Sequence, residues 1–188
     1  MKKTTIMTLA LAAGVATAVI AGSFVFVDHQ PRQVRAQWKN IYRTPGGLVA
    51  GADLIVLANH VVAEPGRVVG EGEDATPFTN NTFEIQSVMR GVHNGSQLVV
   101  EQTGGILSSG AVFDINDGGP YAPGSTYLLF LKSRGDGTYY VINHQARYRV
   151  ADGILEGVDP TDPVVARFHG LPLEAGQRVV EKRVRMIE

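Results

Sequence analysis

The sequence predicts a small, mainly β domain with a C-terminal helix, preceded by an apolar N-terminal segment. Short runs of β-branched and aromatic residues recur between residues 53 and 156, and several alternate apolar with polar positions, as strands do. Asp-Gly pairs separate neighbouring runs, which is typical of hairpin turns. The 22 glycines also favour many turns over long helices. We expect about seven or eight strands in a closed barrel, because closure removes exposed sheet edges.

Residues 4–27 contain no charged side chain and form the apolar N-terminal segment. A helix over Ile6–Val27 would be about 33 Å long, enough to cross a hydrocarbon core of about 30 Å. The apolar part of a secretory signal is usually only about 7–15 residues long. The length therefore favours a retained transmembrane anchor over a cleaved signal, with cleavage after Ala18 or Ala36 as the alternative. We assign residues 1–27 to this anchor or signal segment.

The charges on the two sides of this segment give conflicting signals for its orientation. Lys2 and Lys3 favour an N-terminus inside the cell, whereas the basic residues that follow the segment favour the opposite. A Lys-Lys start followed by an apolar run of small residues is typical of export signals. We therefore expect the domain outside the cytoplasm, tethered to the cell membrane by a single span, or secreted if the segment is cleaved.

An acidic domain follows a basic linker. Residues 28–47 form the linker, and residues 28–43 hold four basic residues against one acid. Residues 44–188 hold 11 basic and 17 acidic residues, a net charge of −6. This balance argues against nucleic acid as a partner, since phosphate binding needs clustered Lys and Arg. The absence of cysteine excludes disulfide scaffolds, thiolate zinc sites and cysteine nucleophiles.

The linker and the chain that follows it hold one predicted helix and two predicted strands. We expect a short helix near Val34–Tyr42. Asp53–Glu64 is apolar on both faces, as a central strand is. Pro65–Pro77 is rich in glycine and acid, which predicts a surface loop. Asn81–Met89 alternates and predicts the second strand, with a bulge at Ser87-Val88, where the alternation slips.

Strands and tight turns are predicted to follow one another as far as residue 156. Asp136-Gly137 and Asp152-Gly153 each lie between apolar runs and predict two hairpins. In the run Arg147–Val150 we expect Tyr148 to point inward and both arginines, Arg147 and Arg149, to point outward. The strands expected here are Gln97–Gln102, Ala111–Ile115, Thr126–Leu131, Thr138–Asn143, Arg147–Val150 and Ile154–Glu156.

The last stretch of the chain predicts a helix. Leu173, Val180, Val184 and Ile187 fall at spacings that place them on one face. Pro172 suits the first helical position, where its missing N–H costs no hydrogen bond. We therefore expect residues 48–188 to form the barrel domain, with this helix packed on it.

Five stretches of the chain resemble a group of uncharacterised exported bacterial domains. That group is similar to the netrin-like, metalloproteinase-inhibitor type of OB barrel. The resemblance covers residues 47–188 and implies a five-stranded barrel with extra hairpins and a packed C-terminal helix. Inhibition in that family depends on an N-terminal cysteine, which this chain lacks, so the resemblance implies a fold and no activity. The stretches are LVAGADLIVLANHVV, TFEIQSVMRG, APGSTYLLFL, YYVINHQARYRVADG and GLPLEAGQRVVEKRV.

The five histidines do not form a metal-binding pattern. None lies at the i, i+4 spacing that brings two imidazoles to one metal. His60 and His144 lie in predicted strands and would meet across a barrel, where we expect a structural role. The segment Asp114–Gly119 alternates carboxylate and amide groups like a calcium loop, but Gly118 and Ser125 stand where ligands are required. We expect no metal and no cofactor.

The available hydroxyls do not form a catalytic pattern. Ser108, Ser109 and Ser125 are not in a Gly-x-Ser-x-Gly elbow. We therefore expect no enzyme; a small hydrolase with a dispersed active site is the alternative, favoured if His60 or His144 lies in a pocket within reach of Ser or Asp.

Two further features suggest binding. Arg134-Gly135-Asp136 matches the tripeptide that integrins recognise, although turn chemistry accounts for its Gly and Asp. Aromatic residues with arginines beside them would form the ligand face of an OB barrel, and peptide or glycan remains open as the ligand. The residues of this face are Tyr139, Tyr140, Tyr148, Arg147 and Arg149.

The sequence therefore favours a non-enzymatic, membrane-tethered extracytoplasmic module that binds a protein or cell-envelope ligand. The hydrolase is one alternative. A structural or assembly subunit is another, favoured if the small-residue face Gly14, Ala18 and Gly22 or a barrel edge mediates oligomers. Ligand, process and oligomeric state are not specified by these residues.

Overall fold

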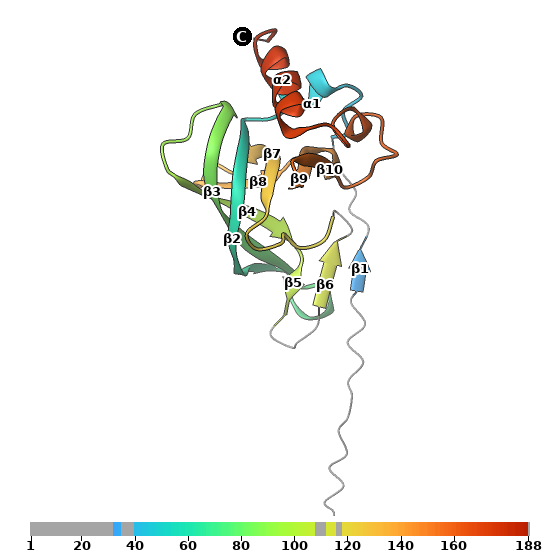
Figure 1. Cartoon of the computed structure of the whole chain (residues 1–188). Helices are drawn as coiled ribbons and strands as arrows, with labels where there is room; N and C mark the ends of the chain where they lie inside the picture. The colour runs from blue at the N-terminus through green and yellow to red at the C-terminus, as the bar shows by residue number, and fades with distance from the viewer. Residues whose placement is uncertain (1–31, 35–39, 108–111, 116–117, 188) are drawn as a thin grey trace, which may run out of the picture.

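The computed structural model describes residues 32–34, 40–107, 112–115 and 118–187. Over these ranges the chain is mainly β with a C-terminal helix, as predicted (Figure 1). The predicted anchor, residues 1–27, lies outside the described residues. In the ranges that are described, no helix is long and apolar enough to span a membrane. The main elements are β1 (Arg32–Val34), α1 (Pro45–Gly51), β2 (Leu54–Val69), β3 (Thr76–Arg90), β4 (Gln97–Thr103), β5 (Gly105–Ile106), β6 (Val112–Ile115), β7 (Thr126–Ser133), β8 (Thr138–Val141), β9 (Arg147–Ala151), β10 (Ile154–Gly157) and α2 (Leu173–Val184).

Most strands belong to one sheet, in the order β10-β9-β7-β2-β3-β4-β8. Strand β8, at one end of this order, also pairs with β7 in its middle. All pairings in this sheet are antiparallel except the one between β4 and β8. A second, three-stranded sheet has the order β1-β6-β5.

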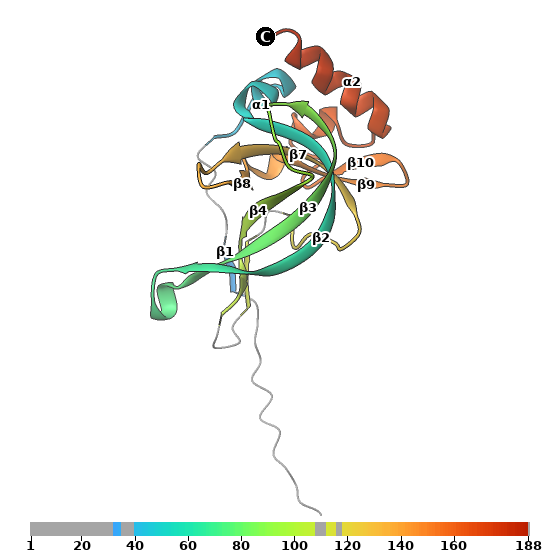
Figure 2. The ribbon, with the colours of Figure 1, turned by 90° about the vertical axis from the view of Figure 1, so that its left-hand side faces the viewer.

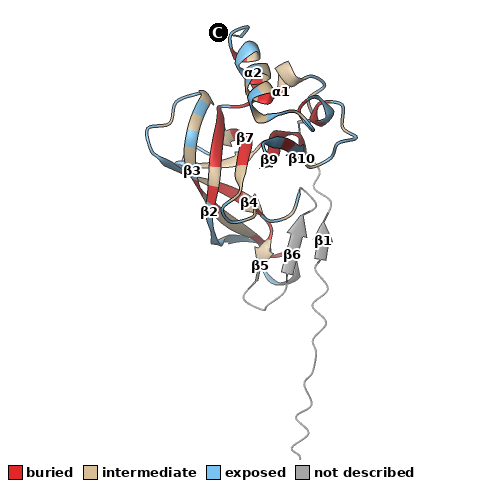
Figure 3. Ribbon diagram, viewed as in Figure 1, coloured by how far each residue is buried: buried red, intermediate tan, exposed pale blue. Residues whose placement is uncertain are grey.

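The first half of β2, residues 54–60, and the middle of β7, residues 127–131, are covered on both faces (Figure 3). Leu54, Val56 and Ala58 of β2 face an inner core that includes Phe83. The alternate residues of β2 face a second core, beneath the helices. Because both faces are covered over residues 54–60, this part of the strand has apolar residues at consecutive positions. The prediction of a central strand at Asp53–Glu64 is confirmed, since β2 lies between β7 and β3, although residues 61–64 are exposed.

The prediction of a surface loop at Pro65–Pro77 is wrong. Strand β2 continues to Val69 and pairs with β3 up to Thr76, so the turn is confined to the residues between them. Figure 2 shows this arm extending from the domain. Pro65 is tolerated in the strand because the register shifts between it and Val68.

Near its other end, the register of β2 against β3 is irregular around the predicted bulge. It shifts between Ile55 and Val56 and again between Leu57 and Ala58. These irregularities lie on either side of Ser87-Val88, the position at which the alternation of the sequence slips.

The predicted C-terminal helix is α2, which packs on α1 and β10. Val180 and Val184 are buried as predicted, but Ile187 lies beyond the helix and is 45% exposed. Pro172 caps the helix rather than occupying its first position.

The described parts of the linker contain no helix at Val34–Tyr42. Arg32–Val34 is strand β1, and residues 40–42 are not helical. The helix begins instead at Pro45, where the Gly47 N–H donates to Thr44 Oγ1 over 3.1 Å. A Thr cap followed by Pro at the first position starts a helix efficiently, and this signal outweighs the apolar residues upstream.

Both predicted hairpins are present. Strands β7 and β8 flank Asp136-Gly137, and β9 and β10 flank Asp152-Gly153. Asp152 and Gly153 have φ angles of 50° and 77°, the conformation that a two-residue hairpin requires.

Candidate functional site

A cavity opens where strands β4 and β8 separate. The two strands run parallel and pair only at Val99–Thr138 and Val100–Tyr139. Beyond these pairs a cavity of about 70 Å³ lies between the strands, lined in part by Glu101 and Tyr140. The site is thus at the carboxyl ends of two parallel strands, where a sheet offers a crevice.

Arg147 lines this cavity, contrary to the prediction that it points outward. Arg147 is only 6% exposed, whereas Arg149 is exposed as predicted. The guanidinium lies 3.7 Å from the centre of the Tyr121 ring and donates to the carbonyls of Gly119 and Pro120 over 2.7 and 3.1 Å. The beginning of strand β9 is therefore covered on both faces, whereas the side that Arg147 shares with Arg149 is exposed at Arg149.

Glu101 holds two further arginines at the rim. Its carboxylate accepts from Arg67 Nε and Nη2 over 2.8 and 3.0 Å, and Arg134 Nη2 lies 2.5 Å from its Oε1. Hydrogen bonding to Glu101 raises the pKa of the Arg67 guanidinium. Because the Glu101 side chain is only 7% exposed, its charge is shielded from solvent and needs these partners.

Aromatic rings fix the two rim arginines. The Arg67 guanidinium carbon lies 4.5 Å from the centre of the Phe78 ring, and that of Arg134 lies 4.9 Å from the Tyr140 ring. Stacking of this kind favours one orientation of each guanidinium before any ligand binds.

A broader depression adjoins the cavity and shares Glu101 and Arg134 with it. Its volume is about 420 Å³, and Arg67, Asn80 and Thr138 also line it. We call the cavity and this depression together the arginine groove. Three arginines thus meet two carboxylates, the buried Glu101 and Asp136, and leave the groove one net positive charge in a domain whose net charge is −6.

The tripeptide Arg134-Gly135-Asp136 is engaged with its own chain. Arg134 is bound to Glu101, and Asp136 Oδ1 accepts from the N–H and the hydroxyl of Thr138 over 2.9 and 2.6 Å. The hydroxyl bond lowers the pKa of Asp136. Both charged groups that an integrin would bind are therefore already paired: Asp136 within the turn, and Arg134 with Glu101 of strand β4.

The predicted aromatic face is not assembled as one surface. Tyr148 is fully buried beneath the helices, and Tyr139 packs against His93. Of the three predicted tyrosines, only Tyr140 lines the arginine groove. Sequence reasoning did not identify Arg67, Glu101, Arg134 and Tyr121 as members of one site, because the chain separates them widely and only the sheet topology unites them.

His60 and His144 have different partners and do not form a pair. His60 is in β2, 1% exposed, with its ring 5.1 Å from that of Phe83 and 5.8 Å from that of Tyr121. Burial lowers the pKa of His60. The prediction of a strand at His144 is wrong, because His144 lies in a single helical turn, His144–Ala146.

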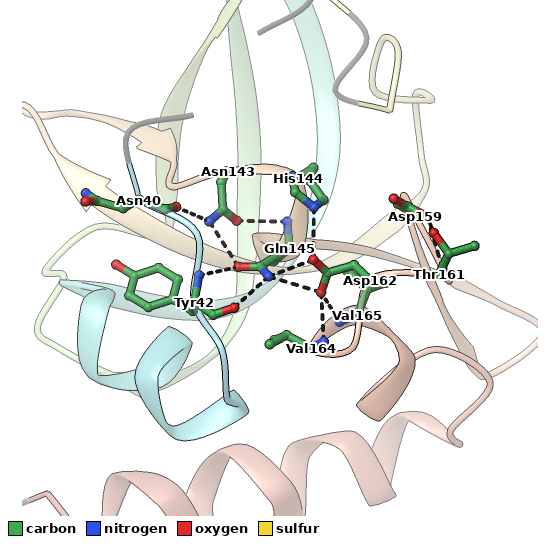
Figure 4. A network of polar contacts seen from close by, with 10 residues as sticks. All are labelled: Asn40, Tyr42, Asn143, His144, Gln145, Asp159, Thr161, Asp162, Val164 and Val165. Carbon is green, nitrogen blue, oxygen red and sulfur yellow. Dashed lines mark hydrogen bonds and ion pairs between the residues drawn. The ribbon is translucent and has the colours of Figure 1, made fainter. Parts of the chain in front are cut away.

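His144 belongs to a polar network that joins three segments of the chain (Figure 4). Its Nε2 lies 3.4 Å from Asp162 Oδ2, while the buried amide of Gln145 donates to Asp162 and to the carbonyl of Tyr42. Burial would raise the pKa of Asp162, but hydrogen bonds from Val165, Gln145 and neighbours hold it below its usual value.

The network bears on the hydrolase alternative, which is favoured if His60 or His144 lies in a pocket within reach of Ser or Asp. His144 is within reach of a carboxylate, but no serine or threonine hydroxyl among the described residues donates to it. The hydroxyl of Thr161 donates to Asp159 instead, over 2.6 Å. Ser108 and Ser109 lie outside the described residues.

The residues of the predicted calcium-like segment are described only in part. Asn116 and Asp117 of the calcium-like segment lie outside the described residues. In the part of the chain that the structure covers, no group of three or more His, Asp or Glu side chains is placed to hold a metal ion.

Comparison of the chain with protein-family models and with curated proteins finds no match.

Proposed function

We propose that this protein is a non-enzymatic, membrane-tethered extracytoplasmic module and that its arginine groove binds a protein or cell-envelope ligand. The observation that carries the proposal is the gathering of three arginines in one groove: Arg67 and Arg134 pair with Glu101, and Arg147 lines the same cavity as Glu101. The groove therefore keeps an excess of positive charge within an acidic domain, which favours an anionic ligand.

The groove has the features of a preorganised binding site. Its guanidinium groups are stacked on aromatic rings, so little side-chain entropy is lost when a ligand binds. Arginine also presents paired donors that match the planar geometry of carboxylates. These features support recognition without requiring a nucleophile or a metal.

We also propose that the sheet is a closed, OB-type barrel of the netrin-like kind. Support comes from the strand pairings, which run from β2 through β3, β4 and β8 to β7 and back to β2. The parallel pair, β4 and β8, is where two hairpin-connected parts of the chain meet. In this arrangement the groove lies where the wall of the barrel opens.

The second candidate function is the small hydrolase, which the His144–Asp162 contact favours. It would require a nucleophile from a residue outside the described ranges. The arginine groove favours binding because its charged groups lie in a cavity and His144 does not line that cavity.

Photo-crosslinking in the native cells tests the binding function. A photoreactive amino acid at Asn80, in the groove, should give one discrete adduct, and the same amino acid at Arg178 on α2 should not. Arg134→Gln should abolish the Asn80 adduct, because it removes a groove charge. Absence of the adduct, or the same adduct from both positions, would overturn the proposal.

The extracytoplasmic placement has its own test. Alkaline phosphatase fused at residue 44 should be active, since the enzyme matures only outside the cytoplasm. An inactive fusion would place the domain in the cytoplasm.

A further inference from the structure

We infer that the cavity between β4 and β8 takes one carboxylate group of the ligand, with Arg147 as its buried anchor. This inference rests on the proposed function and specifies its chemistry. Three properties of the cavity carry it: the charge of Arg147, which has no counter-ion among the described residues, the volume, and the net charge of the lining.

The first property is the state of Arg147. Its guanidinium is buried, and none of the ion pairs among the described residues involves it. Two carbonyls, of Gly119 and Pro120, accept from it, so most of its N–H donors have no acceptor in the part of the chain that is described. A buried charge without a counter-ion is costly, and an anion in the cavity would offset that cost.

The second property is size. A cavity of about 70 Å³ exceeds the space of a single water, about 30 Å³, but falls far short of the roughly 300–1,000 Å³ of a small-molecule site. It accommodates a carboxylate with the carbon that bears it. The remainder of the ligand would lie in the adjoining depression, against Arg67 and the Arg134 guanidinium.

The third property is charge. Arg134 and Arg147 against Glu101 leave the cavity lining with one net positive charge. A carboxylate matches that charge, whereas a phosphate dianion exceeds it and would meet about twice the repulsion from Glu101 that a carboxylate meets. The planar carboxylate also suits two parallel N–H donors of one guanidinium. A peptide C-terminus and a sugar acid share this chemistry.

Titration of the full chain in detergent micelles, followed by the ¹⁵N signal of the arginine Nε–H groups, tests the inference. The probes are N-acetyl-alanyl-alanine, its C-terminal amide, methyl glucuronide and inorganic phosphate. At least one carboxylate probe should shift the Arg147 signal to saturation, and the amide should not. The stronger of the two carboxylate probes identifies the source, peptide or sugar acid.

Matched variants separate the anchor from a general effect of charge. Arg147→Lys keeps the positive charge but loses the paired donors, and it should weaken binding about tenfold or more. Arg149→Lys, on the outer side of the same strand, should leave binding unchanged. Arg134→Gln, at the rim, tests the cavity if the Arg147 variant fails to fold.

Two outcomes would overturn the inference while leaving the binding function intact. One is equal binding of the acid and its amide; the other is tighter binding of phosphate than of either carboxylate. If the Asn80 adduct is found in cells but either outcome is obtained, the groove binds a ligand by some other group.

Discussion

At the scale of single residues, the least satisfied polar side chain described is His60. Neither ring nitrogen forms a hydrogen bond of good geometry with the described residues, and the nearby Asn81 side chain and Ala122 backbone only partly offset the effect of burial. The ring packs against Phe83 and Tyr121. Burial lowers the pKa of His60, and the positive charge of Arg147 acts in the same direction. The imidazole is therefore harder to protonate in the folded protein than in the unfolded chain.

His60 should make the fold sensitive to mild acid. The folded pKa of His60 lies below the unfolded value of about 6.5. The contribution of the neutral ring to the free energy of unfolding is therefore fully present above pH 6.5, and it is lost as the pH falls below that value and through the folded pKa. On going from pH 7.5 to pH 5, His60→Leu should therefore lose less of its free energy of unfolding than the wild type does. At pH 7.5 the two free energies should agree within about 1 kcal/mol. Urea unfolding at several pH values measures both effects.

The control for this prediction is Phe83→Leu, which loosens the same cluster without removing a titratable group. Its loss of stability relative to the wild type should be the same at every pH. If the difference between His60→Leu and the wild type were equally independent of pH, His60 would not be the acid-sensitive group.

The burial of Arg147 is a feature that the local sequence pattern does not predict. Alternation along β9 correctly predicts that Tyr148 and Arg149 lie on opposite sides. It cannot predict that the side shared by Arg147 is partly covered, because the cover is Tyr121, which comes from a distant loop. Burial of a charge by a remote aromatic ring leaves no local pattern in the sequence.

At the scale of elements, the end of β3 depends on one close approach between backbones. Gly91 follows β3 with a φ of +83°, and a Cβ at this position would lie 2.2 Å from the carbonyl oxygen of Asp53. Gly153, in the β9–β10 hairpin, has a φ of +77° and no atom within 4 Å of such a Cβ. The two glycines therefore share a conformation but differ in their surroundings.

This difference predicts unequal costs for the same substitution. Gly153→Ala should lower the free energy of unfolding by about 1 kcal/mol, the conformational cost alone. Gly91→Ala should lower it by about 3 kcal/mol or more, because β2 and β3 must also separate locally. Chemical denaturation of both variants measures the difference, and equal losses would show that the Asp53 contact can be relieved without cost.

The sequence predicts the strands of the sheet better than it predicts their length. Alternation and Asp-Gly turns are local signals, and they correctly place β3, β4, β7 and β8 and both hairpins. The β2–β3 arm was predicted as a loop because glycine and acid are poor strand formers. The arm pairs because it continues the apolar β2–β3 hairpin, and the composition of residues 65–77 alone does not predict this.

At the scale of the whole molecule, the network around Gln145 joins the end of the linker to the domain. The Gln145 amide accepts from the Tyr42 N–H over 2.9 Å and donates to the Tyr42 carbonyl over 2.9 Å and to Asp162 over 2.9 and 3.0 Å. Asn143 adds a bond to the carbonyl of Asn40 over 2.6 Å. Residues 40–42 are thus fixed to the segments around residues 143 and 162, so this network is a joint between three parts of the chain.

Gln145→Glu should break this joint, although the glutamate side chain has nearly the same shape as glutamine. The substitution places a second carboxylate against that of Asp162 and removes the donor to Tyr42, so we expect a loss of about 3–5 kcal/mol at pH 8. The loss should shrink toward pH 5, because protonation of one carboxyl restores a donor. Gln86→Glu makes the same exchange at an exposed residue and should change stability by less than about 0.5 kcal/mol. Unfolding by urea at both pH values measures the effect, and increased protease cleavage near residue 42 should accompany it. A loss that does not depend on pH would mean that Asp162 is not the group that opposes the new charge.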